Sequence, residues 1–561
     1  MHRLPRLLLL ALLVLIGAGW SSLTGLAQSA PPSPSAYRIY FGDQAGLAAL
    51  AGELDIWRVD HADGYLVAPL APDQLARVRA VYQVEPEPAP LLFPVHPAAQ
   101  QQGIPGFACY RTVEETSATL AALAAQYPNL ARLQTIGASW DKTQPDGPPG
   151  YDLEVLILTN QATPGPKFRF FLMGAVHARE LTTAETATRF AESLLAGYGV
   201  DPDATWLLDY GELHVLPMAN PDGRKKAEAG QLWRKNTNNV TAACSFQNTA
   251  STYGVDLNRN SSFQWNSCPG CSSSDSCSLT YRGTAPASEP ETQAIEGYMA
   301  SIFADRRGLE LTDAAPADTQ GLMVSLHSYS EYVLFPWGFT ADEAPNGPAL
   351  QTLGRKFGYY LNYSACQSGA AGCFYPTDGT HDDWAYGVLG IPAYTFELGA
   401  WFFEDCNFFE QQILADALAA LRYGFKAARA PYQIPAGPEV VNLAVTSPTV
   451  AAGQLITLTA LADDTRSYGG SYGSDAAQPI AAVQMTLDAP PWQPGVTPHL
   501  LIPTDGAFDA PQEAVHLPIN TACWPAGRHT LFVQAQDSAG NWGTTSAHFV
   551  NVEESVSLAL S

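Results

Sequence analysis

The stretch FRFFLMGAVHARELTTAE, residues 168–185, decides how the rest of this sequence is interpreted. It begins with an apolar run that is typical of a buried strand, and it continues at once into His177 and Glu180, three residues apart. On a turn that leaves a strand, two such side chains can point to one side and supply two ligands of a metal ion. The HxxE pattern is weak on its own, because many helices contain it by chance. Its meaning therefore depends on the surrounding chain.

Residues 106–432 alternate buried strands with amphipathic helices. Continuously apolar runs such as DLEVLILT (152–159) are separated by helical runs such as TSATLAALAAQYP (116–128). This pattern predicts an α/β domain with a mixed, mostly parallel sheet and helices on both faces. Functional side chains of such folds gather at strand ends. The run GLMVSLHSY (321–329) places His327 at such an end, where it can supply a third metal ligand.

The helical pattern stops after residue 432. Residues 433–561 contain short β-type runs such as QLITLTALADD (454–464) and GRHTLFVQAQDSAGNWG (527–543), with turn residues between them. This region predicts an all-β, immunoglobulin-like sandwich. Association with a cell surface is one function that we consider for it.

The composition favours a secreted protein. The chain of 561 residues has a formal net charge of −25, which argues against nucleic acid and anionic membranes, because both need clustered Lys and Arg. Residues 1–30 have the basic start, apolar run and small residues of an export signal. No later run is apolar for long enough to span a bilayer, so we do not expect an integral membrane protein.

Five more motifs follow in a fixed order: LWRKN (232–236), GVDLNRN (254–260), LHSYS (326–330), FYPTDGTHDDW (374–384) and YTFELG (394–399). Their order and spacing resemble the zinc metallocarboxypeptidases of the carboxypeptidase A and B family, over about residues 108–430. The resemblance implies a catalytic domain in which one Zn²⁺ is held by His177, Glu180 and His327. The C-terminal sandwich is absent from the digestive enzymes and resembles secreted bacterial members.

The same resemblance implies the other site residues. Glu397 would be the general base for the attacking water, and Arg234 would stabilise the oxyanion. Asp256 would accept a hydrogen bond from a ligand imidazole, that of His177, and fix its tautomer. The implied substrate-binding residues are Arg179, lining the next subsite, and Asn258, Arg259 and Tyr375, holding the terminal carboxylate. A planar guanidinium suits a carboxylate because two parallel hydrogen bonds form, so the expected substrates are the C-termini of peptides or proteins.

The specificity hypothesis rests on Asp382, which falls where the family places the residue at the base of the specificity pocket. An acid at that point favours substrates that end in Lys or Arg, and substrates that end in a hydrophobic residue are considered as well. Asp383, beside it, is expected to be structural. We therefore expect a secreted metallocarboxypeptidase that accepts basic C-terminal residues.

Two other functions compete with this hypothesis. The first is an amidase of the same fold that acts on cell-wall peptides or amino-acid conjugates, with Asn258 and Arg259 holding a different carboxylate. The second is an inactive binding module that uses the sandwich for attachment. The presence of Glu397 together with all three metal ligands argues against the second, because a silent domain needs no base aimed at a metal.

Residues 31–105 precede the catalytic domain and consist of a small unit and a linker. Short runs in the order strand, helix, two strands, helix, strand predict a ferredoxin-like α+β unit, and the linker is rich in Pro and Gln. A compact unit between an export signal and an enzyme is typical of a pro-segment that assists folding or blocks the site. A permanently attached accessory domain is the alternative.

The chain contains nine cysteines, so at least one thiol is unpaired or pairs between molecules. CPGC at 268–271 is the pattern of a redox motif or half a zinc knuckle, but a loop closed by disulfides is favoured because no second CxxC lies nearby. Cys366 and Cys373 form a second short-range pair. The resemblance implies a disulfide between Cys244 and Cys277.

Overall fold

The computed structural model describes residues 36–87, 103–240 and 253–554. The predicted export signal and most of the linker lie outside the described residues. Within the described ranges, no helix is both long and apolar enough to cross a membrane.

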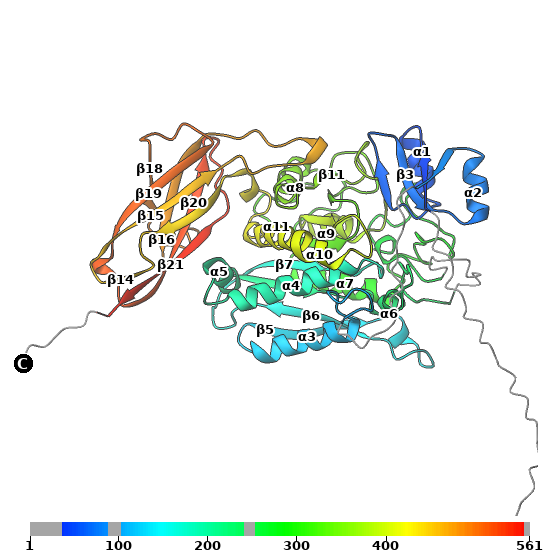
Figure 1. Cartoon of the computed structure of the whole chain (residues 1–561), viewed down its shortest axis with the longest axis horizontal. Coiled ribbons are helices and arrows are strands. Elements are labelled where there is room, and N and C mark those ends of the chain that lie inside the picture. The colour runs from blue at the N-terminus through cyan, green and yellow to red at the C-terminus, as the bar shows by residue number, and fades with distance from the viewer. Residues whose placement is uncertain (1–35, 88–102, 241–252, 555–561) are drawn as a thin grey trace, which may run out of the picture. The chain divides into compact units, whose positions relative to one another are not determined.

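An eight-stranded mixed sheet forms the centre of the fold (Figure 1) and confirms the predicted α/β class. Its strands, in spatial order, are β11 (Ser364–Gln367), β10 (Tyr332–Phe335), β12 (Ala393–Glu397), β9 (Leu322–His327), β7 (Phe168–Met173), β8 (Gly211–Leu216), β6 (Asp152–Leu158) and β5 (Ala131–Ala138). The four middle strands β12, β9, β7 and β8 are parallel to one another, whereas β6 and β5 pair antiparallel. The carboxyl ends of the middle strands therefore meet at one edge.

The central sheet is buried on both faces. Along β7, Phe170 and Leu172 belong to one apolar layer, and Phe171 and Met173 belong to the other, as the twofold period of a strand requires. The first layer is built with α3 (Val113–Gln126), α4 (Leu181–Gly197), α5 (Pro202–Tyr210), α6 (Pro221–Glu228), α8 (Gly347–Leu361) and α11 (Leu414–Ala427). The second layer contains α7 (Pro290–Ile302) and α9 (His381–Leu389). Helices on both faces explain why the strand sequences are continuously apolar.

The N-terminal unit has the element order β1 (Ala36–Tyr40), α1 (Gln44–Ala51), β2 (Arg58–Asp60), β3 (Tyr65–Pro69), α2 (Pro72–Arg79) and β4 (Gln83–Pro86). Its antiparallel sheet has the order β2-β3-β1-β4. Ile39 and Leu66 of this unit share an apolar cluster with Leu334, Cys366 and Phe374 of the central domain. The unit is thus packed against the domain that carries the predicted site.

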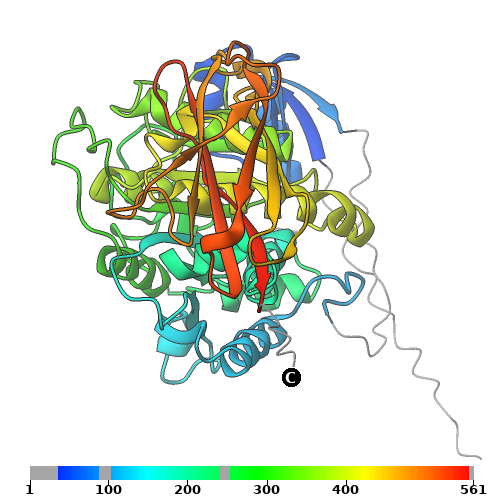
Figure 2. The same cartoon turned by 90° about the vertical axis from the view of Figure 1, so that its left-hand side faces the viewer.

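The C-terminal region contains two sheets, whose strands are coloured yellow to red in Figure 2. One sheet has the order β13 (Glu439–Val445), β15 (Leu455–Asp463), β19 (Gln512–Asn520) and β18 (Ile502–Pro503); the other has β14 (Thr449–Ala451), β21 (Ser546–Glu553), β20 (Gly527–Asp537), β16 (Ile480–Leu487) and β17 (His499–Leu500). Both sheets contribute to one apolar cluster that includes Leu458 and Val533. This arrangement is consistent with a β-sandwich.

The C-terminal sheets also contact the central domain. The indole of Trp492 lies 5.7 Å from that of Trp206, measured between ring centroids, and the guanidinium of Arg429 lies 4.6 Å from the Trp492 ring. Nearby, Lys426 Nζ donates to Ser546 Oγ at 3.3 Å, and the Ala547 N–H of β21 donates to Asp203 Oδ1 at 3.0 Å. Aromatic and charged contacts of this kind bury surface of both the C-terminal region and the central domain, so the C-terminal region is packed against the central domain.

Candidate active site

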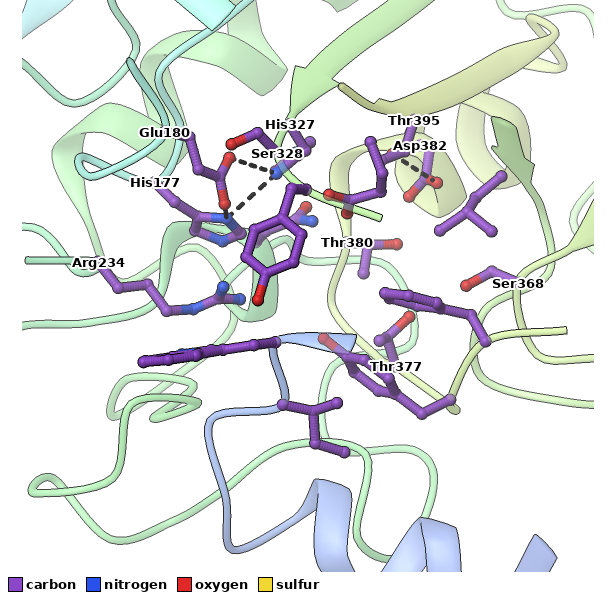
Figure 3. A pocket seen from close by; sticks show the side chains of 18 of the residues that line it. His177, Glu180, Arg234, His327, Ser328, Ser368, Thr377, Thr380, Asp382 and Thr395 are labelled. Atoms are coloured by element: carbon purple, nitrogen blue, oxygen red, sulfur yellow. Dashed lines mark hydrogen bonds and ion pairs between the residues drawn. The ribbon is translucent and has the colours of Figure 1, made fainter. Parts of the chain in front are cut away.

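Three neighbouring strands bring the predicted catalytic residues to one edge of the sheet. His177 and Glu180 follow β7, His327 is the last residue of β9, and Glu397 is the last residue of β12. Because these strands are parallel, their carboxyl ends lie together. Figure 3 shows His177, Glu180 and His327 pointing toward one another.

The turn after β7 presents the first two side chains. Ala175 adopts a left-handed backbone conformation with a φ of 51°, and its N–H donates to Thr183 Oγ1 at 2.9 Å. Glu180 occupies the position before α4, yet its side chain makes no capping hydrogen bond. The Glu180 carboxylate instead lies beside His177, with Oε1 at 2.7 Å from Nδ1.

The three side chains have the spacing of metal ligands. His327 Nδ1 lies 3.1 Å from His177 Nδ1 and 3.2 Å from Glu180 Oε2, and each residue is at most 3% exposed. Two ligands bound 2.0–2.1 Å from one tetrahedral Zn²⁺ are about 3.4 Å apart, close to the distance between the two imidazoles. Within the described residues, Glu180 Oε2 and His327 Nε2 are buried without a hydrogen-bond partner.

The hydrogen bond to Asp256 explains why this cluster fits a cation. His177 Nε2 lies 3.1 Å from Asp256 Oδ1, and an ionised carboxylate can only accept, so Nε2 carries a proton. When the ring is neutral, its Nδ1 presents a lone pair toward Glu180 and His327. Buried lone pairs that converge in this way repel unless a cation lies among them. Two imidazoles and one carboxylate match the donor set of zinc in hydrolytic sites.

Asp256 also holds Arg234. The Nε and Nη2 groups of Arg234 donate to Asp256 Oδ2 at 3.1 and 2.9 Å. Burial would raise the pKa of the Asp256 carboxyl, but Arg234 and His177 hold it well below its usual range. Asp256 is therefore ionised and fixes both partners at the pocket that the metal-ligand cluster lines.

Glu397 faces the same pocket from the neighbouring strand. In the register of β12 and β9, Glu397 is paired with His327. Enclosure by the protein, and next the charge of Glu180, raise the pKa of the Glu397 carboxyl well above its ordinary value. A carboxyl with a raised pKa close to possible metal ligands is suited to accepting and returning a proton.

The predicted carboxylate-binding residues Asn258, Arg259 and Tyr375 line this pocket as well. Arg259 Nε donates to Cys271 O at 3.1 Å, and its Nη1 donates to Asn258 O at 2.7 Å. The Tyr375 ring is stacked on Phe374, with 4.4 Å between ring centroids. Backbone oxygens thus orient the guanidinium before any substrate arrives.

Asp382 lies in another part of the pocket, next to Thr395 (Figure 3). It is 7% exposed; Thr395 Oγ1 donates to its Oδ2 at 3.2 Å, and the Asp383 N–H donates to its Oδ1 at 3.0 Å. Among the residues that the structure describes, no Lys or Arg forms an ion pair with it. The Gly338 N–H donates one bifurcated hydrogen bond to both carboxylate oxygens of Asp383, each at 3.0 Å, so the contacts of Asp383 fit the structural acid expected there.

Arg179 departs from the prediction that it lines a subsite. It is 1% exposed, and its Nη1 and Nη2 donate to the two carboxylate oxygens of Asp55, each at 2.6 Å. The following residues, Ile56 and Trp57, line the pocket, whereas Arg179 does not. The physical reason is that an acid of the N-terminal unit binds the guanidinium and covers it. The sequence contains no local signal for this contact, because the partners are 124 residues apart.

The described residues contain three disulfides: Cys268–Cys271, Cys366–Cys373 and Cys109–Cys406. The first two agree with the predicted short-range closures. The third joins segments 297 residues apart and was not expected. Cys523 is an exposed free cysteine, as an odd number of thiols requires. Cys244, the implied partner of Cys277, lies outside the described residues.

Comparisons with known proteins agree with this geometry. A family model described as zinc carboxypeptidase matches residues 116–413, more than half of the chain. Zinc carboxypeptidase A 1 of Anopheles gambiae is 30% identical over 299 residues, which are 52% of this chain and 60% of that protein. The zinc carboxypeptidase of Saccharothrix mutabilis subsp. capreolus is 30% identical over 305 residues, 52% of this chain and 62% of that protein. The chain spans about half to three fifths of the length of such relatives.

Solved structures share the fold. Carboxypeptidase A from Helicoverpa armigera superposes with a TM-score of 0.56 at 22% identity, covering 71% of this chain and 97% of that one. Thrombin activatable fibrinolysis inhibitor superposes with a TM-score of 0.52 at 20% identity, covering 71% of this chain and 98% of that one. With the family match over more than half of its length, this chain belongs to the zinc carboxypeptidase family.

Proposed function

We propose that this protein is a zinc-dependent metallocarboxypeptidase that removes residues from the C-terminal ends of peptides. The observation that carries the proposal is the pocket in which His177, Glu180 and His327 converge while Glu397 and Arg259 line the same space. Zinc, when bound, supplies a Lewis acid that activates water and polarises the scissile carbonyl. His177, Glu180 and His327 are the residues that would hold it.

Glu397 is assigned the proton transfers. Its carboxylate takes the proton from the attacking water and returns it to the leaving amine, which cannot depart as an anion. Its place beside His327 on the adjacent strand supports this role, because the base must lie close to the metal ligands. Arg234, which Asp256 holds at the pocket, is assigned to the oxygen that becomes negatively charged when the carbonyl is attacked.

Asn258, Arg259 and Tyr375 are assigned to the substrate's terminal carboxylate. A clamp for a free carboxylate restricts cleavage to the last peptide bond, which makes a peptidase an exopeptidase. The bonds that tie Arg259 to Cys271 O and Asn258 O support this assignment, since an oriented guanidinium loses less freedom on binding.

A preference for C-terminal Lys or Arg is the finer part of the proposal. Asp382 is a buried acid in the pocket, and it accepts hydrogen bonds from a hydroxyl and a backbone N–H. A cationic substrate side chain would give this carboxylate the ion pair that the described residues do not provide. The hydroxyl groups of Ser368, Thr377 and Thr380 also line the pocket and can hydrogen-bond a guanidinium or ammonium group.

We further propose that the N-terminal unit is a pro-segment that blocks the site. Asp55 pairs with Arg179, and Ile56 and Trp57 line the pocket, so this unit occupies space that a substrate needs. The Trp57 Nε1–H also donates to Asp55 Oδ2 at 2.7 Å, which holds these residues in one arrangement. Export, and association of the C-terminal sandwich with a cell surface, stay predictions from the sequence.

The test compares the full chain with the chain after limited digestion. Residues 80–110 contain no Lys or Arg, so trypsin has no target there and subtilisin is the suitable protease. With zinc present, the digested protein should release Arg from benzoyl-Gly-Arg, while the intact chain should be at least about tenfold slower. The proposal fails if neither form releases an amino acid from benzoyl-Gly-Arg or benzoyl-Gly-Phe. Cleavage of a cell-wall peptide alone would favour the amidase.

A further inference from the structure

His381 lies against Asn258 of the proposed carboxylate clamp and takes no part in the proposed metal binding or proton transfers. It is the first residue of α9 and is 0% exposed. Its backbone N–H donates to Asn258 Oδ1 at 3.2 Å, and its ring Nδ1 lies 3.3 Å from the same oxygen. The side-chain oxygen of Asn258 therefore faces two nitrogen atoms of His381.

The backbone contact decides the orientation of the Asn258 amide. A backbone N–H can only donate, so the amide atom that faces it must be the oxygen and not the nitrogen. Since that oxygen can only accept, the Nδ1 of His381 must carry the ring proton. Both the amide orientation and the histidine tautomer follow from one hydrogen bond.

With its oxygen fixed, Asn258 has one way to present its nitrogen. The described residues provide no hydrogen-bond partner for Nδ2, and Asn258 lines the pocket. An amide nitrogen with two N–H donors is the group that a substrate carboxylate needs. Reversing the amide would instead turn a carbonyl oxygen toward that carboxylate and repel it.

The contribution of His381 to folding is a poor explanation for its presence. Its Nε2 is buried and has no partner among the described residues, so the loss of its hydration opposes the gain from the bond to Asn258. An apolar side chain of similar size would avoid that cost. Burial, with the nearby His327 and His177, lowers the pKa of His381 to about 3, so the ring stays neutral at physiological pH.

The backbone holds His381 and Asn258 together. The Ser261 N–H donates to Gly379 O at 2.9 Å, which joins the two segments. Gly379 has a φ of 63°, and a Cβ there would lie 2.5 Å from Arg259 O. Only glycine allows so close an approach, which brings the start of α9 up to the clamp.

We propose that His381 is a positioning residue for substrate binding: its Nδ1–H and backbone N–H fix Asn258 so that the amide nitrogen faces the terminal carboxylate of the substrate. The inference rests on the proposed carboxypeptidase function. It concerns the strength with which a free carboxylate is bound and leaves the proton transfers at Glu397 unchanged.

The test uses the full chain after subtilisin digestion and three variants. His381→Phe removes the ring donor and keeps a flat ring, and His381→Leu serves the same purpose if the Phe variant does not fold. His381→Asn is the matched control, because its Nδ2 takes the place of the ring Nδ1. Zinc content and the thermal midpoint are measured for each variant. Kinetics use benzoyl-Gly-Arg or benzoyl-Gly-Phe, whichever the wild type cleaves faster, and the corresponding C-terminal amide.

His381→Phe should raise KM for the free acid at least tenfold and change kcat less than threefold. It should also lower the ratio of kcat/KM for the free acid to kcat/KM for the C-terminal amide. His381→Asn should restore most of the loss. In a double variant with Asn258→Ala, His381→Phe should add no further loss, because both act through one amide. An unchanged KM in an active enzyme, a His381→Asn variant as impaired as His381→Phe, or additive losses would overturn the inference. An inactive wild type would instead refute the proposed function.

Discussion

Asp55 accepts two hydrogen bonds from the guanidinium of Arg179, and this pair joins the N-terminal unit to the turn that carries His177 and Glu180. Both side chains are buried, at 4% exposure for Asp55 and 1% for Arg179. Removal of one member of a buried pair leaves the other charge without compensation, so the interface depends strongly on this contact.

Asp55→Asn should therefore activate the undigested chain. Without the carboxylate, the N-terminal unit binds less tightly, and the rate of benzoyl-Gly-Arg cleavage should rise about tenfold or more. Asp63→Asn, at an exposed acid of the same unit, is the matched control and should stay latent. Equal latency in both variants would count against the proposed block.

Glu397→Gln should abolish turnover without loss of the metal. The amide cannot accept the proton of the attacking water, so kcat should fall by about 10²–10⁴-fold, while the three ligands still bind one zinc per chain. Stoichiometry is measured by atomic emission after dialysis. Zinc loss in this variant would mean that Glu397 belongs to the ligand set.

The same variant should change the pH dependence of stability in metal-free protein. The pKa of Glu397 is raised in the folded state above the unfolded value of about 4.3, so between the two values the folded protein binds more protons and stability falls as pH rises. Metal-free Glu397→Gln should be more stable than metal-free wild type at pH 7, and the difference should vanish near pH 4. Urea unfolding at both pH values checks this.

Asp382→Asn should reverse the proposed preference for basic C-terminal residues. Without the negative charge, kcat/KM for release of Arg should fall about 100-fold, whereas release of Phe from benzoyl-Gly-Phe should change little. The Phe substrate serves as the internal control for folding and for the metal site. A wild type that prefers Phe and does not cleave after Arg would reject the specificity hypothesis.

Removal of zinc should lower the thermal midpoint. Three buried groups that repel in its absence are stabilised by the ion, and excess zinc should raise the midpoint by about 5–15 °C over the chelated protein. His327→Ala should show a much smaller shift. Calorimetry with and without chelator measures both. Identical midpoints in the wild type would argue against a metal at this site.

The C-terminal region should stabilise the central domain. Trp492→Ala removes the contact with Trp206 and with Arg429 and should lower the free energy of unfolding by about 2 kcal/mol. Leu500→Ala, at a position 65% exposed, should change it by less than about 0.5 kcal/mol. A Trp492→Ala variant as stable as the wild type would show that the sandwich is an independent appendage.

The features that the sequence predicts well are those that depend on short spacing or on periodicity. Continuous apolar runs predicted a sheet buried on both faces, and strand ends marked His177 and His327 as neighbours. The pairing of Asp55 with Arg179 has no such pattern in the sequence. An acid in a short loop has the same local sequence whether it is exposed or paired with a distant residue. The disulfide between Cys109 and Cys406 was missed for the same reason, since loop closure over 297 residues has no local signature.

The contact between His381 and Asn258 is another feature that the sequence does not predict. Both residues lie in motifs that the sequence singles out, but their 123-residue separation hides the hydrogen bond. What brings them together is the backbone approach at Gly379, a requirement that one glycine in a loop does not reveal by itself.

The register that places Glu397 opposite His327 limits the insertions that β9 and β12 can accept. Because side chains alternate along a strand, one extra residue inside either strand would send base and ligand to opposite faces of the sheet. Their separation is thus set by the backbone ladder and by no adjustable side chain. Loops around the pocket can vary in length without moving Glu397 or His327, whereas an insertion within β9 or β12 would separate these two side chains.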